Sequence, residues 1–499
     1  MKRKRIFPLA ALVLLFAILA SSCGGGKTPA EQTTATEQTT ATTVATTATS
    51  ATTEATTAVS TVEPYTPPTD FGGYEFVLAG ETMSVNYQCW FVGTPSNAVE
   101  NQLLREYERL ETELNISFVG KHVTYDEAVS NAMAGKSVGD VYYSRIQRIL
   151  SLATQEYIIP LNTDLMRSAG LDVDDPEQVD YHATRLSKQL DGENVWSVAF
   201  SGRFFDNRWG YGLAFNKRLL ETAGYPADTM YQLVRDGKWT WEKFEEICRS
   251  FAETDWNGNY ILSYIGTFGA RMFPDIATFT PIVSRGDDGK WRSNVDSPEF
   301  RSAAEFLDKI LGPDIWQERN EYCAVVAIDR NGDEGIRSFN AGKVGMFIRN
   351  GQHFGYVYGR LPYSANDEIG FIPMPKASED AEYVSVYELY GLCIEKANPD
   401  PQRSAYILSE LSKILNDPSY EAINIRGLVC DEGSVEMIME YVRPNSVLPI
   451  MYEVKTVTDD LFNNLQGYYA DLDYAKSLDE IISTYHPQLQ AALDELFEQ

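Results

Sequence analysis

The composition of the chain changes abruptly near residue 70, and this change separates a part that can fold from a part that cannot. Residues Thr28–Thr61 consist almost entirely of Thr, Ala, Glu and Gln, contain a tandem EQTTAT repeat, and include no aromatic or basic residue. Such a segment cannot bury enough apolar surface to offset the conformational entropy that is lost on ordering. We therefore expect a disordered linker over residues 23–69 and a folded body from about Asp70 to Gln499.

Residues 1–22 have the features of a secretory signal peptide. A basic segment, Lys2–Arg5, precedes the apolar run Ile6–Ala20, which is shorter than the roughly 20 residues that a transmembrane helix needs. The following Ala20-Ser21-Ser22-Cys23 resembles the bacterial lipobox, in which the cysteine is lipidated and becomes the mature N-terminus. The resemblance implies an extracytoplasmic protein that is lipid-anchored through Cys23 to the outer face of the cell membrane. An ordinary cleaved signal peptide is the alternative.

The size and charge of the body limit its architecture and its partners. About 430 residues exceed what one hydrophobic core usually supports, so we expect two lobes. The chain has a formal charge of −29, which becomes −33 once the four basic residues of the signal are removed. This acidity argues against nucleic acid and against anionic membrane surfaces as partners.

The sequence lacks the common motifs for metal binding and catalysis. Five widely spaced cysteines follow Cys23 without any C-x-x-C, and the four histidines show no metal-ligand spacing. The Asp/Asn-rich stretches Asp255–Asn259 and Asp329–Asp333 lack the full calcium-loop pattern, so we interpret them as turns. No G-x-S-x-G, P-loop or G-x-G-x-x-G is present. We therefore expect no metal, no cofactor and no enzymatic activity.

The first part of the body alternates between strands and helices. Strands are predicted over Tyr74–Ala79, Ile116–Val119 and Asp140–Tyr143, and capping boxes at Asn97/Glu100 and Thr124/Glu127 predict helix starts. Strands separated by helices of this length are typical of parallel βαβ units, so the predicted class is α/β. An apolar stripe at helical spacing is formed by Val99, Leu103, Tyr107, Leu110 and Leu114.

The same alternation continues to the end of the chain. Strands are predicted over Trp209–Phe215, Val344–Ile348 and Ile369–Ile372, and helices over Lys217–Ala223 and Pro401–Leu415. Further helices are predicted to start at the cap Thr240, at Ser297-Pro298 and at the capping box Ser477/Glu480, with a kink at Pro487 in the last one.

Short phrases in a fixed order give the chain a family resemblance. They are Ala134–Val141, Ile158–Leu161, Leu213–Lys217, Trp239–Phe244, Phe339–Met346, Ile369–Pro375 and Tyr390–Ile394. Together they resemble the extracellular solute-binding proteins of ABC importers, in the carbohydrate group that includes maltose-binding protein. The resemblance spans nearly all of Phe71–Gln499.

The resemblance implies a two-lobed periplasmic-binding-protein-like fold of type II, with a ligand cleft between lobes that close by a hinge. It divides the body into an N-terminal lobe of residues 70–198 and 387–443 and a C-terminal lobe of residues 199–386 and 444–499. The implied partners are a small solute, namely a sugar or oligosaccharide, and the permease subunits of an ABC transporter. A monomer is expected.

The body is rich in aromatic residues, whose flat faces suit sugars when they line a concave site with a few polar groups. For any single aromatic residue, a place in the core is the alternative. Three of the candidate arginines, Arg208, Arg271 and Arg349, would also suit an acidic sugar, or form salt bridges across the cleft. The ligand-binding candidates are Trp90, Tyr142, Tyr143, Arg145, Arg208, Trp209, Phe268, Arg271, Arg349, Asn350, Gln352, Glu388 and Tyr390.

Two other classes of function fit the same sequence features. A secreted glycan-active enzyme needs only a pair of suitably placed carboxylates, and the chain has many. A surface adhesin or a sensor partner would bind a polymer or a membrane receptor without lobe closure. Capture of a carbohydrate or related solute for transport is the main prediction.

Overall fold

The computed structural model describes residues 62–81, 98–201, 209–226, 228–253, 262–264, 280–311, 342, 344–349, 368–387, 390–429, 431–448, 450, 454–469 and 475–497. All of them belong to one unit, Ser60–Gln499, which is separate from Met1–Val59. The predicted signal peptide, Cys23 and the Thr-rich stretch lie outside the described residues. Within the described part, no helix is both long and apolar enough to cross a membrane.

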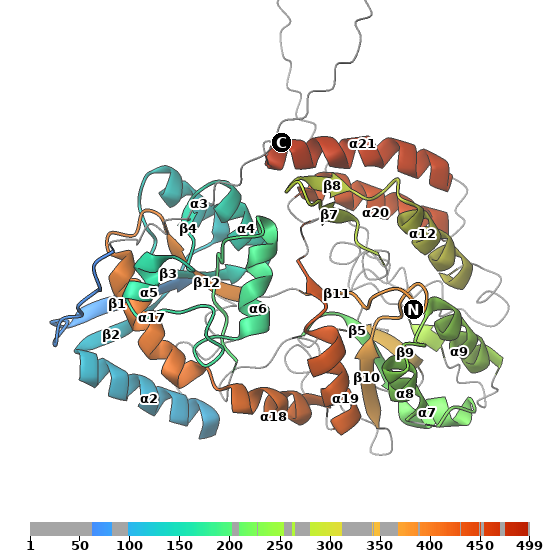
Figure 1. Cartoon of the computed structure of the whole chain (residues 1–499), viewed down its shortest axis with the longest axis horizontal. Helices are drawn as coiled ribbons and strands as arrows, with labels where there is room; N and C mark the ends of the chain where they lie inside the picture. The colour runs from blue at the N-terminus through green and yellow to red at the C-terminus, as the bar shows by residue number, and fades with distance from the viewer. Residues whose placement is uncertain are drawn as a thin grey trace, which may run out of the picture. The chain divides into compact units, whose positions relative to one another are not determined.

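The first sheet has five strands in the order β2-β1-β3-β12-β4 (Figure 1). Strand β1 runs parallel to β2 and β3, whereas β12 runs antiparallel to both β3 and β4. This arrangement confirms the predicted α/β class. The bounds are β1 Tyr74–Gly80, β2 Ile116–His122, β3 Val141–Arg145, β4 Ile158–Ile159 and β12 Tyr390–Glu395.

Helices cover both faces of this sheet, and together they form the first lobe (Figure 1). One face, which carries Val141 and Tyr143, packs against buried residues of α2 and α17. The other face, which carries Tyr142, packs against α3 and α4. The helices are α2 Ala98–Leu114, α3 Tyr125–Met133, α4 Ile146–Thr154, α5 Asp164–Ser168, α6 Tyr181–Leu186, the 3-10 helix η1 Ser187–Leu190, and α17 Pro401–Leu415.

Several predicted helix starts are present in the structure. Thr124 and Glu127 form a complete capping box at α3, and Ser477 and Glu480 form another at α21. Asn97, the predicted cap of α2, lies outside the described residues. Helix α21 runs through Pro487, so the predicted kink there stays a prediction. Leu103, Tyr107 and Leu110 of the predicted stripe are buried.

The second sheet has four strands in the order β10-β5-β9-β6 and belongs to the second lobe. Strand β5 is antiparallel to both β10 and β9, and β6 is parallel to β9. The bounds are β5 Gly212–Asn216, β6 Leu262–Tyr264, β9 Val344–Arg349 and β10 Ile369–Pro373. Two-stranded pairs are β7 Val283–Arg285 with β8 Trp291–Ser293, and β11 Ser385–Val386 with β13 Ser446–Val447.

Helix α12 of the second lobe starts at its predicted cap. Ser297 Oγ accepts a hydrogen bond of 3.0 Å from Phe300 N, with Pro298 at the first helical position of α12. Phe300, Ala304 and Leu307 of this helix are fully buried, as their spacing predicts. The helices are α7 Lys217–Thr222, α8 Thr229–Arg235, α9 Trp241–Glu253, α12 Pro298–Leu311, α18 Pro418–Val429, α19 Glu432–Met437, the π-helix η2 Ile438–Val442, α20 Lys455–Tyr469 and α21 Leu478–Leu496.

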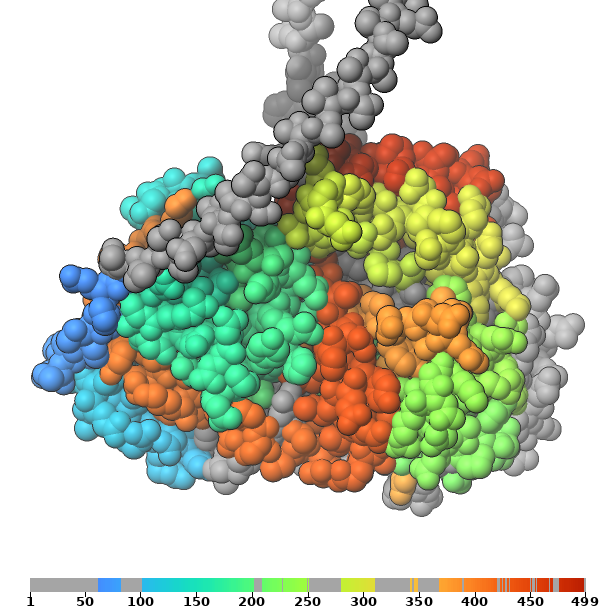
Figure 2. All heavy atoms as spheres, viewed as in Figure 1, coloured from blue at the N-terminus to red at the C-terminus, as the bar shows by residue number. Residues whose placement is uncertain are grey.

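The second sheet is covered by α18, α19 and the π-helix η2. The predicted boundary at residue 443 assigns these helices to the first lobe instead. Their side chains Ile425, Val435 and Ile438 share a hydrophobic cluster with Trp209 and Phe371. Figure 2 shows the orange surface of α17 and α18 continuing into the orange-red surface of α19 and η2. The physical reason is the apolar face of these helices, which covers β10. The other lobe boundaries stay predictions.

Candidate functional site

The carboxyl edge of the first sheet is the place where this kind of fold binds ligands, because open α/β sheets bind them beyond the carboxyl ends of their strands. Strand β3 ends there at Arg145, and β12 begins there at Tyr390. The antiparallel register sets these two residues opposite each other. Two segments that are far apart in the sequence thus supply neighbouring polar side chains.

Tyr143, Arg145 and Tyr390 form a compact group, which we name the Arg145 cluster. Arg145 Nε donates a hydrogen bond of 2.6 Å to the Tyr390 hydroxyl oxygen, and the guanidinium carbon lies 5.6 Å from the centre of the Tyr390 ring. The rings of Tyr143 and Tyr390 are stacked, with centres 5.7 Å apart and planes at 20°. Arg145 and Tyr390 are half-buried, whereas Tyr143 is 5% exposed and lies in the core of the first lobe. The cluster therefore joins a flat aromatic surface to an oriented fork of N–H donors.

The first turn of α4 adds charge beside this cluster. Its N-cap residue, Arg145, makes no side-chain cap, and the first turn contains no acidic residue. Arg148, one turn further along, forms an ion pair with Glu81, directly after β1, and its guanidinium carbon lies 5.3 Å from the centre of the Tyr125 ring. Because a helix N-terminus carries partial positive charge, this edge suits hydroxyl or anionic oxygen atoms.

Two of the candidates, Tyr142 and Trp209, lie in hydrophobic cores. Tyr142 is fully buried on the opposite face of β3 from Tyr143, and this burial raises the pKa of its phenol. Trp209 is 1% exposed and meets Phe371 edge to face, with ring centres 5.7 Å apart. Neither ring is accessible to a solute in this conformation. Alternation along the strand explains the first case, since neighbouring residues point to opposite faces.

The corresponding edge of the second sheet is described only in part. Arg349 ends β9 and pairs through its backbone with Gly212 at the start of β5. The remaining ligand candidates lie outside the described residues: Trp90, Arg208, Phe268, Arg271, Asn350, Gln352 and Glu388.

Among the described elements, the chain changes from one sheet's lobe to the other through three segments. The first leaves the first sheet after Val198, which forms a bridge with Leu392, and enters β5. The second runs from β11 to β12, and the third joins α17 to α18. Strands β11 and β13 pair next to the first segment, where Tyr211 N donates to Val386 O at 3.0 Å. Such paired connections are typical of a hinge.

One buried ion pair fixes the two lobes to each other beside these connections. Arg443 Nη2 of the second lobe lies 2.6 and 2.7 Å from the two carboxylate oxygens of Asp180 in the first lobe. Asp180 is also the N-cap of α6, where it accepts from Ala183 N. Burial, with the positive charge of Arg443, lowers the pKa of the neighbouring His182. This buried, charge-assisted contact holds α6 of the first lobe and Arg443 of the second lobe in a defined relative position.

The described residues contain no group of three or more His, Cys, Asp and Glu side chains that could hold a metal ion. The polar groups at the carboxyl edge are instead donors and aromatic faces. Chemically, this arrangement can bind and orient a polar solute. Sequence reasoning missed Glu81, Tyr125 and Arg148. Of these three residues, only Arg148 could have been predicted from the sequence, because it lies one helical turn after Arg145.

Comparison with solved structures identifies the same fold. The maltosyl-maltose-binding protein of Arthrobacter globiformis is 13% identical with a TM-score of 0.57, over 85% of this chain and 100% of that one. MalE of Xanthomonas citri is 13% identical with a TM-score of 0.56, over 85% and 99%. UgpB of Mycobacterium tuberculosis, solved with glycerophosphocholine, is 18% identical with a TM-score of 0.55, over 85% and 99%. The predicted two-lobed fold is confirmed.

The sequence itself establishes the family. No curated protein sequence matches the chain significantly. The family model described as bacterial extracellular solute-binding protein matches residues 93–402, which is more than half of the 499-residue chain. This match covers all four strands of the second sheet and every strand of the first sheet except β1. The chain therefore belongs to the family of bacterial extracellular solute-binding proteins.

Proposed function

We propose that this protein captures a carbohydrate or a related small solute between its lobes and delivers it to the permease of an ABC importer. The observation that carries the proposal is the Arg145 cluster at the carboxyl edge of β3, beside the segment that joins β11 to β12. The half-buried Tyr390 ring offers a sugar an aromatic face, and the Arg145 guanidinium donates to hydroxyl or carboxylate oxygens. The binding proteins with similar folds support this class of ligand, since one of those compared above is described as binding cyclic alpha-maltosyl-1,6-maltose and another as a sugar-binding protein.

Within this proposal, Arg145 and Tyr390 are the central ligand contacts of the first lobe, and the buried Tyr143 supports the Tyr390 ring by stacking on it. The facing wall would come from the second lobe and the connections, with the remaining residues that the sequence singles out. Those residues are Trp90, Tyr142, Arg208, Trp209, Phe268, Arg271, Arg349, Asn350, Gln352 and Glu388. Tyr142 and Trp209 require the lobes or helices to shift before they reach a solute, because both are now buried.

The anchor at Cys23 completes the proposal. A lipidated Cys23 would hold the protein at the outer face of the cell membrane, and the linker up to residue 69 would let the body reach a permease. A flexible chain of about 40 residues has a root-mean-square span of roughly 35 Å. Lipidation explains how a captor stays beside its transporter when no outer membrane encloses it.

The test is a thermal-shift screen of the purified full-length protein with neutral sugars, uronic acids, polyols and peptides. We expect at least one sugar or sugar derivative to raise the melting temperature saturably, because a ligand that binds only the folded state stabilises it by mass action. A shift with a peptide and with no sugar would overturn the carbohydrate assignment. Chromatography of the incubated sugars tests the enzyme alternative, for which we expect no cleavage.

A further inference from the structure

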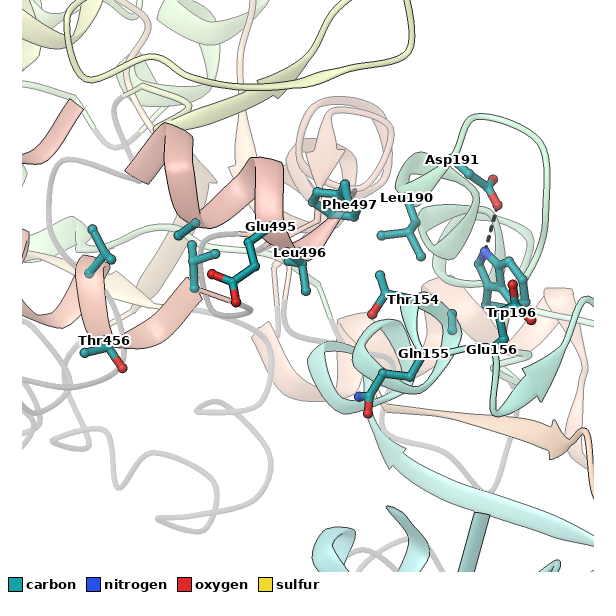
Figure 3. Close-up of a pocket in the computed structure, with 14 residues that line it drawn as sticks. Thr154, Gln155, Glu156, Leu190, Asp191, Trp196, Thr456, Glu495, Leu496 and Phe497 are labelled. Carbon is teal, nitrogen blue, oxygen red and sulfur yellow. Dashed lines mark hydrogen bonds between the residues drawn. The ribbon is translucent and has the colours of Figure 1, made fainter. Parts of the chain in front are cut away.

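A cavity lies at the opposite edge of the first sheet from the Arg145 cluster. Its volume is about 910 Å³, within the range of roughly 300–1,000 Å³ that small-molecule sites occupy. The first lobe lines it with the last turn of α4 and with the turn from Leu190 to Trp196, and the second lobe with the first turn of α20 and the last turn of α21 (Figure 3). Helix α4 spans nine residues, or about 13 Å, between the cluster and this cavity.

The aromatic and aliphatic part of the cavity is held in place by specific contacts. Trp196 is half-buried, and its indole Nε1 donates a hydrogen bond of 3.1 Å to Asp191 Oδ2, the dashed line in Figure 3. Across the cavity, the Phe497 ring stacks on Trp291, with centres 5.5 Å apart and planes at 21°. Trp291 Nε1 in turn donates to Leu190 O at 3.0 Å. The apolar wall is therefore formed before any ligand arrives.

The electrostatics of the cavity favour a positive charge. Two helices, α4 and α21, end at it, and neither has a basic residue in its last turn to offset the partial negative charge of a helix C-terminus. The charged side chains that line it are Glu156, Asp191 and Glu495, and no lysine or arginine is among the lining residues. Glu156 also meets Lys396 at 3.1 Å, but both side chains are mostly exposed, so this pair neutralises little.

The backbone conformation of Glu156 favours a role for its carboxylate in the cavity. Glu156 follows the C-cap of α4 with φ of 57°, the left-handed region that glycine normally occupies at this position. Tyr157 N donates to Leu152 O at 2.9 Å and closes the helix end in this conformation. A non-glycine residue is disfavoured in this conformation. The glutamate keeps a carboxylate at the rim of the cavity that glycine would not provide.

We propose that this cavity binds a small organic cation with an apolar body, of the quaternary ammonium or protonated amine class. The Trp196 ring, the carboxylates of Glu156 and Glu495, and the two helix ends supply cation–π and charge attraction, while Leu190 and Phe497 contact the apolar part. The proposal does not rest on the proposed capture of a carbohydrate, because the two sites lie at opposite edges of the sheet.

The test is calorimetric titration of the full-length protein with choline and with 3,3-dimethylbutan-1-ol, its uncharged isostere, at constant ionic strength. We expect saturable binding of one choline, and binding of the alcohol that is weaker by about tenfold or more, as a loss of cation–π and charge attraction implies. Equal affinity for the two compounds, or no saturable binding of choline, would overturn the proposal.

Variants locate the binding. Glu495→Gln and Trp196→Leu should each weaken choline binding several-fold, whereas Glu193→Gln, an exposed neighbour in the same turn that does not line the cavity, should leave it unchanged. Arg145→Ala should also leave choline binding unchanged, and Trp196→Leu should keep the thermal shift given by a sugar. Loss of choline binding in Arg145→Ala, with no effect of Glu495→Gln, would place the cation at the other edge and contradict the assignment.

Discussion

The two edges of the five-stranded sheet hold polar side chains in different ways. At the amino edge, Asp140 and Glu395 are only 5% and 3% exposed. Asp140 accepts hydrogen bonds from the Tyr74 hydroxyl at 2.6 Å and from Val77 N at 2.8 Å. At the carboxyl edge, Arg145 and Tyr390 are half-buried, and donors rather than acceptors predominate.

The difference separates residues that maintain the fold from residues that are available to a solute. A buried carboxylate is tolerated only when hydrogen bonds replace its water, so the acceptors of the amino edge tie loops to strands. A half-buried guanidinium keeps part of its hydration and loses little when a neighbour changes. Substitutions of the buried carboxylates Asp140 and Glu395 should therefore change stability, and substitutions of the half-buried Arg145 and Tyr390 should change affinity.

The largest effect is expected at Asp140. Asp140→Ala leaves the Tyr74 hydroxyl and Val77 N without their buried acceptor, so we expect the free energy of unfolding to fall by about 3 kcal/mol. Urea denaturation followed by tryptophan fluorescence measures it. Glu75→Ala, which changes an exposed acidic residue on β1 between Tyr74 and Val77, is the control and should change stability by less than about 0.5 kcal/mol. Equal losses in the two variants would contradict the distinction between the edges.

The next effect is expected at Arg145 and concerns affinity. Arg145→Ala should weaken binding of the sugar found by the thermal-shift screen by about tenfold, because a charge-assisted hydrogen bond is lost. Unfolding should change by less than about 1 kcal/mol, since the side chain is half-buried. Calorimetry and urea denaturation measure the two quantities separately.

Two controls sharpen this prediction. Arg145→Lys keeps the charge but removes the planar fork, so its affinity should lie between those of the alanine variant and the original protein. Arg167→Ala removes an exposed arginine of the same lobe that lies away from the edge, and should leave affinity unchanged. A large loss of stability with unchanged affinity in Arg145→Ala would assign the residue to the fold instead.

The sequence predicted the local elements well because their signals are local. The capping boxes at Thr124 and Ser477 and the buried stripe Leu103, Tyr107 and Leu110 depend on residues three or four apart. The assignment of α18 and α19 to a lobe depends instead on which sheet their apolar faces cover. That choice is made by packing across the whole chain, and spacing within the helices does not encode it.

The candidate site shows the same limit. The sequence singles out the segments that contain Tyr143 and Tyr390. Their direct contact depends on a strand pairing that brings Arg145 next to Tyr390, 245 positions away in the chain. The sequence predicts both Tyr142 and Tyr143 as ligand contacts, although strand alternation places only Tyr143 on the same face as Arg145. The cavity beside Trp196 carried no sequence signal, because its walls come from helix ends of both lobes.

The smallest effect is expected at Glu395, and it concerns pH. Burial raises the pKa of the Glu395 carboxyl above its ordinary value of 4.5, in spite of hydrogen bonds from Ser137 and Val138 that act in the opposite direction. The folded protein therefore keeps this proton at pH values where the unfolded chain has released it. The stability that the group contributes is complete below pH 4.5 and is lost as the pH rises through the folded-state pKa.

Glu395→Gln removes this titration while keeping an oxygen that accepts from Ser137 Oγ and Val138 N, each 2.7 Å away in the original protein. We expect the free energy of unfolding of this variant, relative to the original protein, to rise between pH 4.5 and pH 7 in urea denaturation. Glu193→Gln, an exposed control, should give a difference that does not vary with pH. A relative stability that falls with pH would mean that hydrogen bonding outweighs burial, so that the amino edge favours the ionised carboxylate.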